Sequence, residues 1–168
     1  MDLDQQELNE NQVIEEFGRQ LLVPGISEAG QNNLLKKNIL LIGLGALGTI
    51  ASQYLVRAGI GSITLLDFDR VSLSNLHRQI NYNKNDIDQY KSEVSKKILL
   101  NINSVTKIVQ YPISFESFLE INDFDNIDYI FDCSDNYVTK TNSSLFAKSK
   151  SIAYSSISIN SSEGIFFS

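Results

Sequence analysis

The sequence has few of the residues that most often build metal centres and nucleophilic active sites. Its 168 residues include one cysteine, Cys133, and one histidine, His77. A single cysteine excludes an internal disulfide and a structural zinc site of four cysteines within this chain, and it is usual in proteins of a reducing compartment. We therefore interpret Cys133 as a small apolar packing residue and His77 as a residue without a catalytic role.

Long hydrophobic segments and runs of basic residues are also missing. The longest apolar runs are far shorter than the roughly 18 residues of a membrane span, and the first thirty residues lack the basic start and apolar core of a signal peptide. The formal net charge is −6, from 14 Lys+Arg and 20 Asp+Glu. These features predict a cytoplasmic protein that binds no membrane and no nucleic acid, and whose anionic ligands must meet a local site.

Strands and helices alternate along the sequence. The length and the 42% hydrophobic content fit one domain with a buried core. Short apolar runs predict strands at 38–42, 62–67, 107–111, 128–132, 152–156 and 164–167. Apolar residues at helical spacing predict helices at 8–17, 46–58, 91–100 and 139–148. This order indicates an α/β fold, a Rossmann-like, doubly wound and mostly parallel sheet preceded by an N-terminal helical arm.

A glycine-rich loop follows the first predicted strand. Residues 43–48 read GLGALG, which fits the pattern G-x-G-x-x-G at a strand-to-helix junction. Gly43 permits the tight turn, Gly45 lets a phosphate approach the backbone, and Gly48 lets the helix pack closely. Asp67 ends the second predicted strand, where a carboxylate can accept hydrogen bonds from ribose hydroxyls. These residues predict a nucleotide site and leave NAD and ATP undecided.

The polar segment after the second strand carries a more specific signal. Residues 67–79 read DFDRVSLSNLHRQ, Arg19 precedes Gln20, Lys91 opens a predicted helix, and residues 132–136 read DCSDN. From about Phe17 to Ser168, the chain resembles the bacterial branch of the ubiquitin-activating-enzyme-like family, of the ThiF/MoeB/HesA type. Its members include the adenylyltransferases that activate the sulfur carriers of molybdopterin and thiamine synthesis.

The resemblance implies a reaction. Such enzymes join the C-terminal glycine carboxylate of a ubiquitin-like sulfur carrier ending in Gly-Gly to the α-phosphate of ATP, and pyrophosphate leaves. A carboxylate with a pKa of about 3.5 is already ionised at neutral pH, so it needs no general base. The obstacle is repulsion between the carboxylate and the polyphosphate. Catalysis therefore requires positioning, cations and Mg²⁺, in agreement with the lack of a Ser-His or Cys-His constellation.

The resemblance also implies roles for individual residues. It assigns Asp67 to the ribose and assigns Asn75, Arg78 and Lys91 to the phosphates. The full set expected to bind the nucleotide is Gly43, Gly45, Gly48, Asp67, Asp69, Asn75, Arg78, Gln79 and Lys91. Taken singly, Arg78 and Lys91 also fit solvated surface cations, and Asp69 fits a strand-end cap.

Two further residues complete the implied catalytic set of Arg78, Lys91, Asp135 and Arg19. Asp135 is expected to hold Mg²⁺, although a turn residue or helix N-cap beside Asn136 is the alternative. Arg19 is expected to reach the ATP of a neighbouring subunit, which implies a homodimer. A second family arginine, three residues before Arg19, is replaced here by Glu16.

Family members continue beyond the position of Ser168. The resemblance therefore divides the chain into an arm, residues 1–36, and a C-terminally truncated ATP-binding adenylation domain, residues 37–168. The missing part would carry two Cys-x-x-Cys pairs, so zinc is expected only in a longer parent chain. The alternatives are an inactive nucleotide- or partner-binding module, an NAD-dependent oxidoreductase, and an enzyme acting on a modified tRNA nucleoside. Among the carriers, residues 65–79 favour the molybdopterin type.

Overall fold

The computed structural model describes residues 10–103, 105–121, 126–160 and 163–168. Its centre is a six-stranded sheet in the order β3-β2-β1-β4-β5-β6. The strands are β1 (Asn38–Ile42), β2 (Ser62–Leu66), β3 (Lys107–Tyr111), β4 (Tyr129–Asp132), β5 (Ala153–Asn160) and β6 (Glu163–Phe167). The first five are parallel and β6 runs antiparallel to β5. This confirms the predicted mostly parallel, doubly wound fold.

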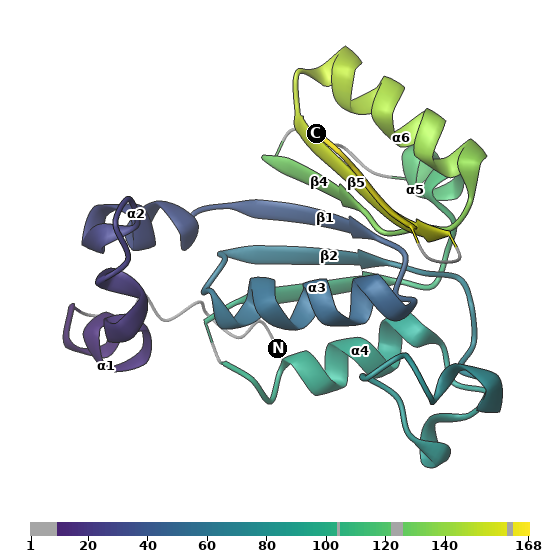
Figure 1. Ribbon diagram of the computed structural model, residues 1–168, viewed down its shortest axis with the longest axis horizontal. Coiled ribbons are helices and arrows are strands. Elements are labelled where there is room, and N and C mark those ends of the chain that lie inside the picture. Colours follow the sequence, from purple (N-terminus) through teal and green to yellow (C-terminus); the bar gives the residue numbers. More distant parts are fainter. Residues whose placement is uncertain (1–9, 104, 122–125, 161–162) are drawn as a thin grey trace.

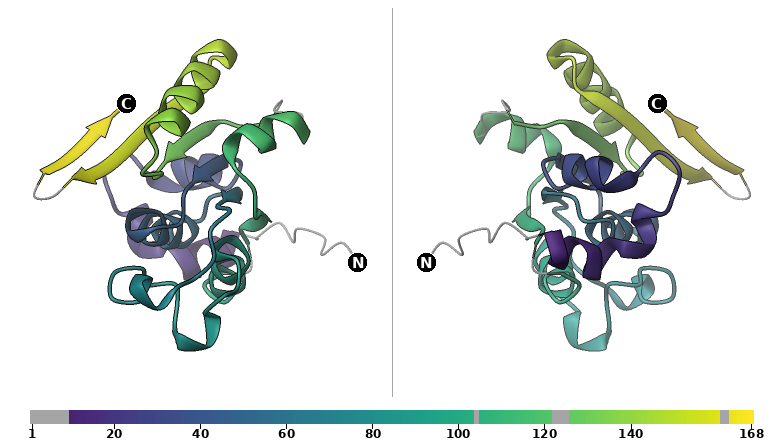
Figure 2. Two further views of the ribbon diagram at one scale, coloured as in Figure 1. Left: turned by 90° about the vertical axis from the view of Figure 1, so that its right-hand side faces the viewer. Right: turned by 90° about the vertical axis from the view of Figure 1, so that its left-hand side faces the viewer.

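Helices cover the sheet on both faces because successive side chains of the apolar strands point to opposite sides. On one face, Leu41 of β1 packs in a core with α3 (Ala46–Arg57) and α4 (Lys91–Leu99). On the other face, Leu40 of the same strand packs with α5 (Phe115–Ile121) and α6 (Tyr137–Lys150). Figure 2 shows these two helix layers on opposite sides of the twisted sheet.

The arm consists of α1 (Glu10–Leu21) and α2 (Ser27–Leu34), and it lies at the end of the sheet where β1 and β2 begin (Figure 1). Phe17 is buried next to Gly59, the residue after the α3 C-cap, where a Cβ would lie 2.5 Å from the Phe17 ring. Gln31 is fully buried, and its Nε2 and that of Gln20 both donate to the Ala58 carbonyl at 3.0 Å. The arm is therefore packed against the domain.

Most sequence expectations agree with these elements. The first expected helix, at 8–17, lies at 10–21, and residues 8 and 9 are outside the described part. Two helices, α2 and α5, were not expected. Helix α2 is held by a long-range hydrogen bond of Gln31, which the local sequence does not reveal, and α5 has only seven residues. Tyr54, one of the apolar residues at helical spacing that predict the helix at 46–58, would be expected in the core, but its side chain is 70% exposed. None of the helices described is long and apolar enough to cross a membrane.

An ion pair joins the two residues that immediately precede the central strands β1 and β4. Lys37 Nζ lies 2.8 Å from Asp128 Oδ1, and the Asn38 amide donates to Asp128 Oδ2 at 2.9 Å. The Lys37 hydrogen bond is the main cause that lowers the pKa of Asp128. A lowered pKa means that the carboxylate stabilises the fold above its unfolded-state pKa and that this contribution is lost as the pH falls through the folded-state pKa.

Asp128→Asn should therefore lower the urea midpoint at pH 7, and the difference from wild type should shrink as the pH falls below the unfolded-state pKa of about 4 and through the lowered folded-state pKa of Asp128. Urea titrations of both proteins at pH 7 and pH 3 measure this. An equal difference at both pH values would show that the charge of Asp128 contributes nothing.

Candidate functional site

The candidate site lies where β1, β2 and β4 end, at the side of the sheet opposite the arm (Figure 1). The Gly43 amide donates to the Leu66 carbonyl, and the Cys133 amide donates to the Ile42 carbonyl, both at 2.8 Å. These bonds bring the loops after three strands side by side. Strands β1 and β4 are neighbours in the sheet but far apart in sequence, so the strand order reverses between them. This reversal is the topological switch point, where α/β proteins bind ligands.

The glycine loop is packed too tightly for side chains at two positions. Gly43 has φ +85°, and a Cβ there would lie 2.9 Å from Ser134 Cα. A Cβ on Gly48 would lie 1.8 Å from the Gly43 carbonyl oxygen. Gly45 differs, because its Cβ direction meets only Gln79 Nε2, at 3.9 Å, and no side chain caps the α3 N-terminus that it begins. This end of α3 can therefore receive an anion.

Asp67 and Tyr82 hold the glycine loop from the side of β2. Asp67 Oδ2 accepts from the Leu44 amide at 2.6 Å, and its Oδ1 accepts from the Asp69 amide at 2.8 Å. Tyr82 Oη donates to the Leu44 carbonyl at 2.9 Å. Burial raises the pKa of Asp67, while Lys91 and these amides act in the opposite direction. Asp67 thus fixes the loop, and each of its oxygens keeps a lone pair for a ribose hydroxyl.

Lys91 is a buried cation that acts on the Asp67 carboxylate and forms an ion pair with Asp69. Its side chain is 7% exposed, and its Nζ lies 2.8 Å from Asp69 Oδ2. The Lys91 amide also donates to the Asp69 carbonyl at 2.9 Å, which fixes the start of α4. The alternative reading of Lys91 as a solvated surface residue is therefore wrong. Asp69 is 54% exposed and reaches toward solvent while it holds the lysine.

The segment between β2 and α4 has different surroundings at Asn75, Arg78 and Gln79. Asn75 Oδ1 accepts from the Ser72 amide and closes a short 3₁₀ helix, Leu73–Asn75. Arg78 is exposed, and its Nη1 donates to the Ser74 carbonyl at 2.9 Å. Gln79 is 4% exposed, and its Oε1 is buried without a hydrogen-bond partner among the described residues. Such an orphaned acceptor near Gly45 indicates space for a ligand that carries a donor group.

The loop after β4 contains the expected metal residue. Asp135 is exposed, while Asn136 Oδ1 accepts from the Val138 amide and caps α6. Asp135 is therefore not the helix cap. The described part of the chain contains no group of three or more His, Cys, Asp or Glu side chains able to hold a metal. A single exposed carboxylate still fits Mg²⁺ that arrives with substrate phosphates, because this ion keeps waters and needs one or two protein carboxylates.

Cys133 and Arg19 lie in different surroundings. Cys133 is buried, and burial raises the pKa of its thiol to about 12, which confirms the interpretation of a packing residue. Arg19 is exposed on α1, at the other end of the sheet from the glycine loop. The fold brings Gly43, Gly45, Asp67, Gln79 and Lys91 together, and it does not bring Arg19 to the site of the same chain.

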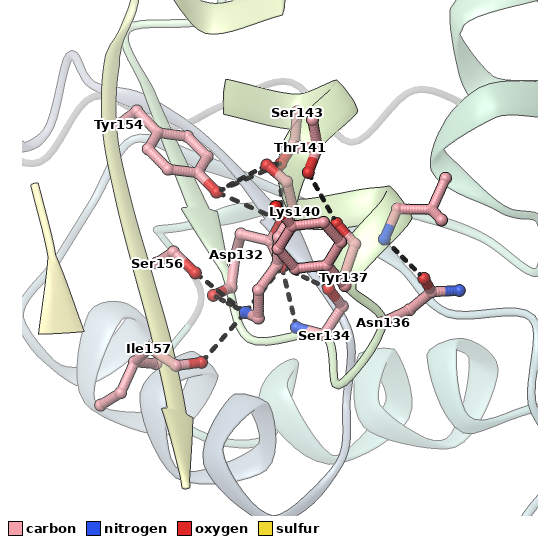
Figure 3. A network of polar contacts seen from close by, with 11 residues as sticks. Asp132, Ser134, Asn136, Tyr137, Lys140, Thr141, Ser143, Tyr154, Ser156 and Ile157 are labelled. Carbon is pink, nitrogen blue, oxygen red and sulfur yellow. Dashed lines mark hydrogen bonds and ion pairs between the residues drawn. The ribbon is translucent and has the colours of Figure 1, made fainter. Parts of the chain in front are cut away.

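Two residues near the site, Tyr82 and Lys140, were not expected from the sequence, and a third, Asp132, was expected only as part of the segment 132–136. Tyr82 supports the glycine loop, and Asp132 forms a buried polar network with Lys140 at the end of β4 (Figure 3). A carboxylate that ends an apolar strand is a visible signal, although by sequence alone Asp132 also fits a simple strand-end cap. Tyr82 has no such signal, since its role depends on a contact 38 residues away.

Residues 17–167 match the model of the ThiF family. The chain belongs to this family. The adenylyltransferase and sulfurtransferase MOCS3 of Dictyostelium discoideum is 39% identical over 127 residues, which are 76% of this chain and 30% of that protein. The sulfur carrier protein ThiS adenylyltransferase of Escherichia coli is 40% identical over 126 residues, or 74% of this chain and 49% of that protein. This ThiF-family chain thus spans less than half the length of these relatives.

Solved structures show the same fold. The E. coli tRNA N6-threonylcarbamoyladenosine dehydratase TcdA in complex with ATP superposes with a TM-score of 0.76 at 22% identity. The match covers 88% of this chain and 60% of that chain. At this identity, the similarity concerns the fold of the ThiF-family chain.

The contact between Gly48 and the Gly43 carbonyl predicts the effect of a single methyl group. Gly48→Ala should destabilise the protein by at least about 2 kcal/mol, because backbone atoms must move to admit the Cβ. Gly18, inside α1, has no atom within 4 Å of its Cβ direction. Gly18→Ala should stabilise the protein by about 0.5 to 1 kcal/mol. Urea unfolding measures both, and a neutral Gly48→Ala would contradict the close packing.

Proposed function

We propose that this chain provides the ATP-binding part of an enzyme that adenylates the C-terminal glycine carboxylate of a ubiquitin-like sulfur carrier. The proposed carrier ends in Gly-Gly, and the proposed pathway is molybdenum cofactor or thiamine biosynthesis. Support comes from family membership and from the names of two relatives, an adenylyltransferase and sulfurtransferase and a sulfur carrier protein ThiS adenylyltransferase. The observation that carries the proposal is the buried Lys91, held by Asp69 beside the uncapped end of α3.

The arrangement suits a polyphosphate better than a neutral ligand. Backbone amides at the start of α3 attract phosphate oxygens, and Gly45 leaves room for their approach. Lys91 lies in a largely water-free position, where a cation acts on a neighbouring anion more strongly than it does in bulk water. Gln79 Oε1 needs a donor, which a hydroxyl or amino group of a nucleotide can supply.

The proposed reaction requires no proton transfer. A carboxylate oxygen of the carrier forms a bond to the α-phosphorus of ATP, the bond between the α-phosphorus and the bridging oxygen breaks, and pyrophosphate leaves. Lys91, Arg78 and the α3 N-terminus would lower the repulsion between the two anions. Asp135 would hold Mg²⁺, which when bound supplies further positive charge to the phosphates.

Asp135→Asn tests the enzymatic role. The substitution removes the charge of an exposed residue and leaves the glycine loop and Asp67 in place, so nucleotide affinity should fall less than turnover. The loss of metal-mediated charge stabilisation predicts a rate reduction on the order of a hundredfold. The assay is ATP–pyrophosphate exchange driven by a Gly-Gly carrier, on the protein encoded by the full reading frame.

Glu120→Gln on α5 is the matched control, because it also neutralises an exposed carboxylate. It should leave the exchange rate unchanged. If Asp135→Asn exchanges as fast as wild type, Asp135 is only a turn residue. If the wild-type protein binds ATP but shows no exchange with any sulfur carrier, the site belongs to an inactive binding module.

We also propose that the protein is a homodimer in which Arg19 serves the partner's site. In the described structure, Arg19 is exposed and remote from the glycine loop of its own chain. A two-fold pairing would give each chain one arginine to donate and one to receive.

Complementation tests this arrangement. Arg19→Ala and Asp135→Asn should each be nearly inactive alone. In a mixed dimer, one site combines Asp135 of the first variant with Arg19 of the second and is complete. Equal amounts that exchange subunits freely should therefore recover about a quarter of the wild-type rate. If a tag demonstrates mixed dimers but no exchange activity is recovered, Arg19 does not serve the partner's site.

A further inference from the structure

Asp132 is a fully buried carboxylate at the end of β4. Its Oδ1 accepts from the Ser134 amide at 2.9 Å and from Ser134 Oγ at 2.6 Å, and its Oδ2 accepts from Ser143 Oγ at 2.6 Å. Figure 3 shows these donors around the carboxylate, together with the hydroxyl group of Tyr154. A buried charge is costly unless it is paired and hydrogen-bonded, and this one is both.

The cation of the pair is Lys140 on α6, whose Nζ lies 3.5 Å from Asp132 Oδ1. The same Nζ donates to Ser156 Oγ at 2.9 Å and to the Ile157 carbonyl at 3.2 Å. In Figure 3 the lysine extends from α6 toward β5, with its amino group between the carboxylate and the strand. Lys140 thereby joins a helix and two strands.

Ser134 connects this network with the nucleotide site. Its backbone packs against the glycine loop so closely that a Cβ on Gly43 would lie 2.9 Å from both its Cα and its amide nitrogen. The amide that faces the loop is also the one that donates to Asp132. The next residue is Asp135. A movement of Asp132 would therefore displace Ser134 from the glycine loop and Asp135 from the position proposed for it beside the phosphates.

We propose that Asp132 and Lys140 are a positioning pair for Asp135. Asp132 holds Ser134 against the glycine loop through two hydrogen bonds. Lys140 connects Asp132 to Ser156 of β5 and so links the loop after β4 to that strand. Neither residue needs to touch the substrate. The effect on catalysis rests on the proposed function, whereas the effect on the position of Ser134 does not.

A comparison of single and double variants distinguishes a positioning role of the pair from a general stabilising role. Removing one member leaves a buried charge without its partner, which destabilises the fold strongly, whereas replacing both by apolar residues of similar size often restores stability. In Asp132→Leu/Lys140→Met, the thermal midpoint should return toward wild type, but the Ser134 amide has lost its acceptor. A pair that serves stability alone predicts that stability and activity recover together.

The experiment compares the wild type, Lys140→Met, Lys140→Arg and this double variant in the full protein. Amide hydrogen exchange at Ser134 should be about tenfold faster in Lys140→Met and in the double variant. In the double variant, whose stability is restored, exchange at Leu40 of β1 should be close to that of the wild type. The kcat of ATP–pyrophosphate exchange should fall about tenfold, with the KM for ATP within about twofold of wild type, because misplacement affects chemistry more than binding. Lys140→Arg keeps the cation and should restore both readouts.

The matched control is Asp128→Leu/Lys37→Met, which removes the ion pair at the beginning of β1 and β4. It should leave the exchange of Ser134 and the kcat unchanged. Unchanged protection of the Ser134 amide in Lys140→Met would overturn the positioning role, even if the double variant fails to fold. Absence of pyrophosphate exchange in the wild type would reject the proposed function, and the amide exchange would still decide the inference.

Discussion

The close contact between the first turn of α3 and the Gly43 carbonyl is the constraint on which the site depends. Gly48 permits it because a side chain at that position would occupy the same space as the carbonyl oxygen. Asp67 holds the loop from β2, and Ser134 packs against it from β4. With the loop fixed from both sides, the α3 N-terminus points its amides outward at the switch point of the sheet.

Charged side chains surround the glycine loop on both sides. A loop that offers bare amides attracts anions, and Lys91 supplies a cation that Asp69 keeps in place with little exposure to water. Asp132 balances Lys140 at the end of β4, so that two ion pairs, each with one buried side chain, flank the loop from β2 and β4. In the proposed function, the amides and Lys91 would reduce the repulsion between a polyphosphate and a carboxylate substrate.

The order of elements could be predicted from the sequence because apolar strands and a strand–glycine–helix junction are local patterns. Local patterns did not reveal α2, which Gln31 anchors through long-range hydrogen bonds, or the orientation of β6, which depends on strand pairing. In the site, the glycines and Asp67 could be expected from spacing. The burial of Lys91 and the roles of Tyr82 and Lys140 could not, because each depends on residues brought together only by folding.

The most direct test of the central claim is calorimetric titration of the protein with ATP and Mg²⁺, and separately with NAD. The account predicts micromolar binding of ATP, weakened in Lys91→Met, and no comparable binding of NAD, because a buried cation and uncapped amides favour the higher charge density of a triphosphate. Micromolar binding of NAD without detectable binding of ATP would contradict it.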